Sequence, residues 1–227
     1  MASPDIPASD RSRVRRAPDR ARYDRGSVHA ILDEGLVAHV GIAVEGQPFV
    51  LPMAYGRDGE RLILHGSVAS RLMRGLGKGL PVCVTVTILD GLVLSRSAFH
   101  HSMNYRSVVV LGTARRLEAP AEVAAALDVL VEHVAPGRVS EVRPSNEVEL
   151  RQTAVLEVPI DEASAKVRTG GPRDDPEDLE LPVWAGVLPI GLVPGDPVAE
   201  ADLPAGVAPS AVVTDWRRGR PPGPGGG

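Results

Sequence analysis

Basic and hydroxyl side chains gather where a short strand is expected to end and a helix to begin. In the run LILHGSVASRLMRGLGKG, Arg71, Arg74 and Lys78 fall at i, i+3 and i+7, which puts three cations on one helix face. Ser67 and Ser70 add hydroxyls near the helix start, where backbone N–H groups favour anions. The cluster has the size and charge that a phosphate group requires, although Arg74 and Lys78 equally suit a solvated helix surface.

Histidines offer a second source of chemistry. His65 directly precedes this turn, so it is the candidate catalytic residue, as a proton donor or substrate contact at a redox site. His100 and His101 are adjacent, and neighbouring strand residues point to opposite faces, so they cannot chelate one ion together. No cluster of ligands at metal spacing accompanies them, and we predict no metal site. The other histidines are expected to be structural: His29, His39 and His133.

Two further polar segments are candidate binding elements. The run FHHSMNYRS is expected to hydrogen-bond a ligand or to brace a dimer, through His101, Ser102, Asn104, Tyr105, Arg106 and Ser107. Arg106 and Ser107 are the preferred pair. Lys166 and Arg168 follow what we take as the last strand. They either supply charge to an anion site at a subunit interface or pair with the acidic run between Asp174 and Asp178.

Composition limits the class of protein. The 227 residues are 43% hydrophobic with a mean hydropathy of -0.01, enough for one globular core. A net charge of -4 argues against nucleic-acid binding, so we expect a small-molecule partner. The single cysteine, Cys83, forms no internal disulfide and suits a reducing compartment. No apolar run reaches the ~20 residues of a membrane span and no secretory signal is visible, so we predict a cytoplasmic protein without membrane contact.

The two ends differ from the middle. Residues 1–22 mix Arg, Asp, Pro and Ser, and we expect an arm that is disordered or contacts a partner. Residues 191–227 are rich in Pro and Gly and are expected to form an extended tail. One domain is therefore predicted over residues 23–190.

Within that domain the pattern is mostly strands. Apolar alternation and turn residues predict strands at 36–44, 48–55 and 61–65, with turns at Glu45-Gly46 and near Gly59. Asp90-Gly91 is expected to turn a further hairpin. Amphipathic spacing predicts helices at 23–35 and 120–135, with a long strand near 105–118 and a last one at 153–160. Six or so strands with marginal helices predict a mainly β fold, closed or nearly closed as an antiparallel barrel.

The ordered motifs HGSVASR, DGLVLSRS, HSMNYRSVVVLG, SAKVR and PVWAGVLP resemble the pyridoxamine 5'-phosphate oxidase-like FMN-binding split barrels, and among them the nitroimidazole-resistance subfamily. The resemblance covers roughly residues 20–190. It implies a six-stranded, Greek-key-like antiparallel split barrel. It also implies a homodimer with two cofactor sites at the subunit interface, holding FMN or, as the alternative, FAD.

The resemblance also assigns roles to residues. Ser70 and Arg71 match the Ser-Arg pair that holds the cofactor phosphate in the oxidases. Along one edge of the flavin ring it places His65 and the four residues Pro52, Met53, Ala54 and Tyr55, which otherwise serve as barrel wall. Trp184 matches the tryptophan of a carboxy-terminal motif that reaches the flavin, or else anchors the core. The arginine that follows in the oxidases is absent, which disfavours their substrate chemistry.

Two functions from different classes remain open. The first is an FMN-dependent oxidoreductase that takes electrons from a transiently bound NAD(P)H and reduces a small organic acceptor such as a nitro-aromatic. The second is a non-catalytic flavin-storage or haem-binding protein, with His65 or His101 as an axial ligand. No Rossmann fingerprint follows a strand, so no dedicated nicotinamide domain is expected.

Overall fold

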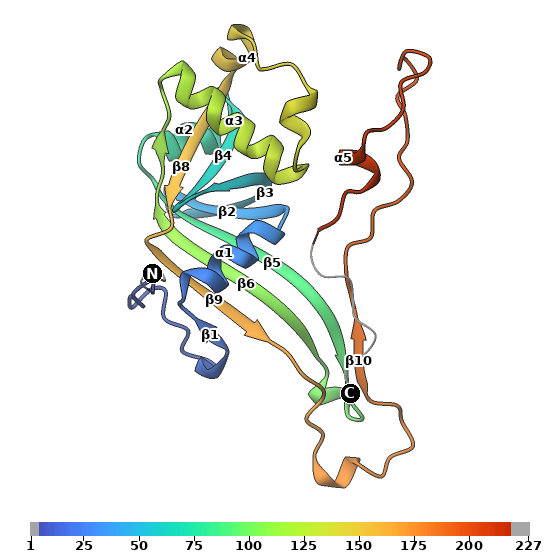
Figure 1. Cartoon of the computed structure of the whole chain (residues 1–227). Coiled ribbons are helices and arrows are strands. Elements are labelled where there is room, and N and C mark those ends of the chain that lie inside the picture. Colours follow the sequence, from blue (N-terminus) through green and yellow to red (C-terminus); the bar gives the residue numbers. More distant parts are fainter. Residues whose placement is uncertain (1–4, 219–227) are drawn as a thin grey trace.

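The computed structural model describes residues 5–218. Within them, ten antiparallel strands pair in the order β1-β9-β6-β5-β2-β3-β4-β8-β7, with β10 on a second stretch of β5 (Figure 1). The strands are β1 (Ala21–Arg22), β2 (Val37–Val44), β3 (Gln47–Asp58), β4 (Arg61–Ser67), β5 (Pro81–Leu94), β6 (Ser102–Thr113), β7 (Arg115–Arg116), β8 (Thr153–Pro159), β9 (Glu162–Arg168) and β10 (Gly186–Pro189). The predicted mainly β, antiparallel split-barrel fold is confirmed, with more strands than the six expected.

Helices stand at the margins of this sheet, as predicted. The α-helices are α1 (Arg25–Glu34), α2 (Arg71–Gly77), α3 (Pro120–Val134), α4 (Glu147–Gln152) and α5 (Ala211–Thr214). Short 3-10 turns are η1 (Pro18–Arg20), η2 (Ala98–His100), η3 (Arg138–Glu141) and η4 (Pro176–Asp178).

The sheet is rolled but its hydrogen bonding does not close. β8 and β9 lie far apart in the strand order, yet only Ile160 and Asp161 separate them along the chain. Ala114 similarly separates β6 from β7. The two edges therefore meet at a corner, and the inward side chains of both halves share one core. That core includes α1 and α2, which bury Val28, Ile31, Leu32, Leu72, Met73 and Leu76 inside the roll.

Local sequence explains how α1 begins and ends. Asp24 caps it by accepting a hydrogen bond from the backbone N–H of Ser27 at 2.7 Å. At the other end, the buried Tyr55 hydroxyl donates to the carbonyl of Leu32 and His133 bonds the carbonyl of Gly35 at 2.7 Å. Tyr55 and His133 also pack together, with ring centroids 4.6 Å apart. Strand β3 and helix α3 thus hold the last turn of α1 in the barrel.

The β2–β3 turn forms as predicted, because Glu45 and Gly46 both adopt positive φ, at 51° and 81°. The hairpin predicted at Asp90-Gly91 is wrong: β5 continues to Leu94 with only an irregularity between Leu89 and Gly91. A Cβ on Gly91 would lie 3.0 Å from the carbonyl oxygen of Leu188 in β10. The glycine therefore allows close strand approach rather than a turn.

Other segments cover two opposite edges of the sheet's outward surface and leave the strip between those edges exposed. Helix α3 packs its apolar side on β3, β4 and β8, forming a second core with Ile63 and Val155. At the opposite edge, residues 9–16 lie along β9, where Ser9 and Arg11 bond Glu162 and the Lys166 ammonium donates to the Arg16 carbonyl. Between them lies a strip that we call the open face: Val37, His39, Val50, Pro52, Thr85, Thr87, Ser107 and Val109.

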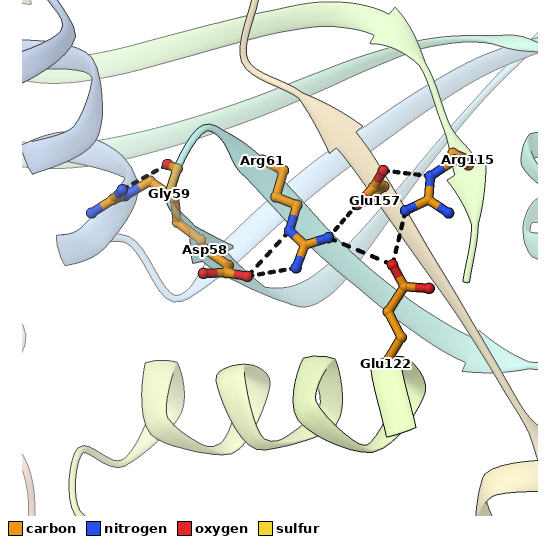
Figure 2. Close-up of polar contacts among 7 residues, drawn as sticks. Asp58, Gly59, Arg61, Arg115, Glu122 and Glu157 are labelled. Carbon is orange, nitrogen blue, oxygen red and sulfur yellow. Dashed lines mark hydrogen bonds and ion pairs between the residues drawn. The ribbon is translucent and has the colours of Figure 1, made fainter. Parts of the chain in front are cut away.

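A network of ion pairs connects the strands under α3 to that helix (Figure 2). Glu157 of β8 accepts hydrogen bonds from Arg61 of β4 at 2.5 Å and from Arg115 of β7 at 2.6 Å. Arg115 also donates to Glu122 of α3 at 2.9 Å, and Arg61 to Asp58 at 2.7 Å. This network links four strands, β3, β4, β7 and β8, to the first turn of α3.

The two end segments have distinct placements. In the N-terminal arm, Ile6 is 1% exposed and belongs to the core, and its backbone N–H bonds the carbonyl of Tyr23. After β10 the chain runs back along the molecule with little regular structure until α5 (Figure 1), and Trp216 then donates to the carbonyl of Val134 at 2.8 Å. The glycine- and proline-rich end, 219–227, and residues 1–4 lie outside the described part of the chain.

Candidate functional site

Strand register aligns several predicted site residues in one row across the outward surface. In order across the sheet, Lys166 of β9 faces Ser107 of β6, and Ser107 faces Thr87 of β5. On the next two strands, Val37 of β2 faces Ala54 of β3. Ala38 pairs with Val86, so one residue further along Val37 lies beside Thr87. Tyr55 pairs with Leu64, so Ala54 lies beside His65, which ends the row. Lys166, Ser107, Ala54 and His65 were predicted from separate motifs, and the sheet places all four on the same surface.

The four residues of β3 do not share that surface. Pro52 is exposed on the open face and Ala54 is half-buried beside it. Met53 and Tyr55 instead point inward, because successive strand residues alternate. Tyr55 is 0% exposed, and burial raises the pKa of its hydroxyl. Its side chain is therefore a core group that fixes α1, and only Pro52 and Ala54 have side chains placed to meet a ligand.

The predicted phosphate residues lie at the end of β4 and the start of α2. Ser67 accepts from the backbone N–H of Ala69 at 3.2 Å, and Ser70 is the N-cap of α2. Arg71 is exposed, with its guanidinium carbon 5.8 Å from the centroid of the Phe49 ring. Lys78 caps the other end of the helix, about 10 Å further along the axis at ~1.5 Å per residue. Ser67, Ser70 and Arg71 thus form one corner, and Lys78 stands apart from it.

His65 sits half-buried between the open face and the second core. Its Nδ1 is buried and has no hydrogen-bond partner among the described residues. Burial lowers the pKa of the imidazole, so the ring is neutral at neutral pH. A neutral imidazole offers one donor and one acceptor, which suits hydrogen bonding to a ligand.

Arg106 is already paired. Its guanidinium lies between two carboxylates, donating to Asp90 at 2.7 and 2.9 Å and to Glu34 at 2.7 Å. These bonds, Glu34 first, raise the pKa of Arg106 further above its ordinary value. The cluster carries one net negative charge, so Arg106 brings no excess positive charge to a phosphate. Its neighbour Ser107 stays on the open face.

Arg168 and Lys166 lie within β9, a strand missed by the sequence prediction. Arg168 is 8% exposed and donates to the side-chain oxygen of Asn104 and towards the carbonyl of Gly170. Burial lowers its pKa. Neither residue pairs with the acidic run, so that alternative is wrong: Asp174 binds Arg96 at 2.6 Å and Asp175 binds His100 at 3.1 Å. Tyr105 faces Arg168 across the strand pair.

His101 and Trp184 lie at the far end of the long β5–β6 ribbon and on the segment that pairs with it. His101 is exposed and its Nδ1 lies 2.9 Å from the carbonyl oxygen of Ser97. Trp184 is 66% exposed just before β10, so it is not a core anchor in this chain. Both are remote in the sheet from α2, so this chain does not bring them to the corner formed by Ser67, Ser70 and Arg71.

A cavity of about 360 Å³ adjoins the open face and was not anticipated. β2 pairs with β5 at Cys83–Val86 and β10 pairs with it at Gly91–Leu94, which leaves the edge of β5 between them without a strand. The cavity occupies this gap. Its lining includes His39, which sequence reasoning treated as structural, because no local signal reveals that this part of the sheet stays uncovered.

Comparison with known proteins identifies the family. A family model, pyridoxamine 5'-phosphate oxidase, matches residues 24–167, and the chain belongs to this family. No curated protein matches at a significant level. No helix within residues 5–218 is long and apolar enough to span a bilayer.

Three solved structures are similar over different extents. The flavocytochrome Anf3 from Azotobacter vinelandii is 41% identical, over 94% of this chain and 100% of that one, with a TM-score of 0.87. The FAD and haem binding protein from Mycobacterium smegmatis is 35% identical, over 88% and 98%, with a TM-score of 0.84. A candidate 5-nitroimidazole antibiotic resistance protein from Bacteroides thetaiotaomicron is 26% identical, over 65% and 86%, with a TM-score of 0.56.

Proposed function

We propose that this protein is a flavin-binding oxidoreductase that carries electrons from a visiting reduced donor to a small organic acceptor. The observation that carries the proposal is the open face: a sheet surface of hydroxyl and apolar side chains, bare between two covered flanks and ending at the Ser70–Arg71 corner. Flavin sites combine apolar walls with a few placed donors and a cationic phosphate contact. Two near-full-length relatives whose names specify flavin or cytochrome cofactors support it.

Each group of residues would bind a different part of the flavin. Ser67, Ser70 and Arg71 bind the phosphate through two hydroxyls and a guanidinium. Ser107 and Thr87 supply hydrogen bonds on the open face, and Pro52 and Ala54 supply apolar contact. His65 orients the reacting edge and exchanges a proton there, as a neutral imidazole. The bound flavin would supply the hydride and electron-transfer chemistry.

FAD is the favoured flavin over the FMN first expected, because the Mycobacterium smegmatis relative is named for FAD and matches almost end to end. The nitro-aromatic acceptor has weaker support, from a relative at 26% identity. NADH or NADPH remains the proposed donor, bound transiently.

Haem binding is a second function with its own support. The same Mycobacterium relative is named for haem as well as FAD, and the other is named a flavocytochrome. Here the cavity at the β5 edge lies near Val37, whereas Arg71 contacts Phe49, which pairs with Ile42 at the other end of β2. Ile42 lies five residue steps after Val37 along β2, which is about 17 Å at ~3.3 Å per step. The corner formed by Ser67, Ser70 and Arg71 and the cavity therefore lie at opposite ends of β2, while Val37, His39 and Thr87 belong both to the open face and to the cavity lining.

We further propose a homodimer with cofactors at the interface. Apolar side chains remain exposed on the open face, with Val50 at 64% and Val37 at 47%. Others line the projecting ribbon and the segment beside it, with Phe99 at 89% and Trp184 at 66% exposed (Figure 1). Large apolar side chains exposed to this degree are typical of a subunit contact. A second copy would also bring His101 and Trp184 to a site.

An absorption spectrum of the purified full-length protein tests the function. Flavin gives two broad bands in the near ultraviolet and blue, and haem gives one intense band at the violet edge. We expect both after reconstitution, and bleaching of the flavin bands by NADH or NADPH in stopped flow. A protein that stays colourless in excess FAD, FMN and haemin contradicts the proposal. Bound flavin that no reduced nicotinamide bleaches indicates a carrier rather than an enzyme.

A further inference from the structure

Three arginines come together at the end of β9. Arg168 is the last residue of this strand, and alternation turns its side chain away from the core, against which the preceding Val167 packs. Strand β1 pairs with β9, so Arg20, the residue just before β1, lies beside the last residues of β9 (Figure 1). Arg173 stands on the loop that leaves β9. The strand end therefore gathers cations from two segments that are far apart in the chain.

Arg168 is a buried cation without a carboxylate partner. It is 8% exposed, and its guanidinium donates only to neutral oxygens, those of the Asn104 side chain and of the carbonyls of the Gly170-Gly171 pair. Burial lowers its pKa, and repulsion from Arg20 and from Arg173 lowers it further. Because buried charges in proteins are normally paired, this guanidinium is suited to bind an anionic ligand.

The other two arginines also keep their charge. Neither Arg20 nor Arg173 forms an ion pair within residues 5–218. Asp174, next to Arg173 in the chain, bonds Arg96 instead, and its side chain is 2% exposed. Asp19, next to Arg20, forms no ion pair with it in this part of the chain. The cluster of Arg20, Arg168 and Arg173 therefore has a net positive charge.

The loop after β9 adds backbone donors to this cluster. Gly170 has a φ of 97°, a conformation that favours glycine, and a Cβ at Gly170 or Gly171 would meet nothing within 4 Å. The N–H groups of both glycines make no hydrogen bond with any residue that the structure describes. Successive free N–H groups beside guanidinium groups are an arrangement that binds phosphate in proteins.

The cluster lies within reach of the open face. Arg168 faces Tyr105 of β6, and Tyr105 faces Leu89 of β5. Leu89 lines the cavity at the β5 edge together with Val37 and Thr87 of the open face. Three strand spacings separate β9 from β2, about 14 Å at ~4.8 Å each. A dinucleotide held at the cluster by one end can therefore bring its other end to the surface proposed for the flavin.

We propose that Arg20, Arg168, Arg173 and the Gly170-Gly171 pair bind the 2'-phosphate of NADPH, and that NADPH rather than NADH is the electron donor. This inference rests on the proposed flavin-dependent oxidoreductase function and names its donor. NADPH passes a hydride, with its electron pair, to the oxidised flavin and leaves as NADP⁺. A phosphate monoester carries a charge of about -1.5 to -2 at neutral pH, which a cluster of arginines complements. NADH has a ribose hydroxyl at that position and leaves the cluster without an anion.

The test measures binding without any flavin chemistry, using full-length protein loaded with flavin. Calorimetric titration with 2',5'-ADP reports on the site, and 5'-AMP is the matched ligand without the 2'-phosphate. We expect 2',5'-ADP to bind the wild type at least about 10-fold more tightly, and Arg20→Ala and Arg173→Ala each to weaken it about 10-fold. Arg13→Ala is the control, because Arg13 is exposed on the same N-terminal arm, and it should change Kd by less than about threefold.

Stopped-flow reduction then tests the donor. At equal donor concentrations NADPH should bleach the flavin bands of the wild type at least about 10-fold faster than NADH, and Arg173→Ala should lose most of that preference. Flavin content and circular dichroism should be unchanged in every variant, because Arg168, the buried member of the cluster, is left in place.

Distinct results overturn the inference and the proposed function. Equal affinity of the wild type for 2',5'-ADP and 5'-AMP removes the 2'-phosphate contact. Equal weakening by Arg13→Ala and Arg173→Ala shows a general effect of charge rather than a site. Equal bleaching by NADH and NADPH removes the donor assignment and leaves the flavin function standing. Bound flavin that neither donor bleaches removes the proposed oxidoreductase function together with its donor.

Discussion

Replacement of Arg71 by alanine separates a phosphate contact from a surface charge. Arg71 is exposed beside the Ser70 cap, and its one described contact is the Phe49 ring at 5.8 Å. An exposed cation–π contact stabilises by about 0.5–1 kcal/mol. For a chain of this size that corresponds to a Tm lower by roughly 2–4 °C per kcal/mol, so the variant should fold.

The effect on flavin binding should be much larger. A hydrogen bond to a charged group contributes about 1.5–3 kcal/mol, which converts to roughly 10- to 150-fold in Kd. Arg74 lies one turn further along the same helix and is equally exposed, so Arg74→Ala is the matched control. We expect Arg74→Ala to change Kd by less than about threefold, because an exposed charge at that distance is strongly screened.

Fluorescence titration of apoprotein with FAD, FMN and riboflavin provides the assay. Riboflavin lacks the phosphate, so its Kd should be nearly the same for wild type and Arg71→Ala. Equal weakening of riboflavin and FMN would show that Arg71 shapes the site rather than binding phosphate. Equal weakening by Arg74→Ala and Arg71→Ala would refute the assignment of a specific contact.

Three further predictions concern stability. Burial lowers the pKa of His133, so this histidine stabilises the fold at a pH above its ordinary pKa of about 6.5, and the stabilisation is lost as the pH falls. His133→Gln should therefore reduce the fall in Tm between pH 7 and pH 5, while His65 keeps its own contribution to that fall. The same fall in Tm in the variant and in the wild type would contradict this. Tyr55→Phe leaves the Leu32 carbonyl without its buried donor and should cost about 1–3 kcal/mol in urea unfolding, whereas a cost near zero would mean that water replaces the hydroxyl. Glu157→Gln weakens the contacts to Arg61 and Arg115 in Figure 2, and because both arginines are partly exposed we expect about 1 kcal/mol, with 0.5 M salt reducing the difference from wild type.

Strong local signals explain what the sequence predicted well. The helices predicted at 23–35 and 120–135 and the Glu45-Gly46 turn each depend on residues close together in the chain, and each forms close to the expected place. Ser70 also caps α2 as its position before Arg71 suggests.

Pairing between strands that are far apart in the chain explains what the sequence analysis missed. Strand β9 faces the core with Ala163 and Ala165, whose small side chains give little apolar periodicity, so it was not recognised as a strand. Asp90-Gly91 has turn chemistry, but pairing with β10 keeps β5 extended there. Met53 and Tyr55 cannot contact a ligand on the open face, because alternation along β3 points their side chains into the core. His39 lines the cavity at the β5 edge, and no local signal reveals this because the gap depends on how β2 and β10 pair with β5.

Native mass spectrometry of the purified full-length protein, reconstituted with FAD and haemin, tests the central claim most directly. The account predicts a dimer whose mass exceeds that of two 23.9 kDa chains by two flavins, with added haem in the same species. A species without any flavin under these conditions, whether monomer or dimer, would contradict it.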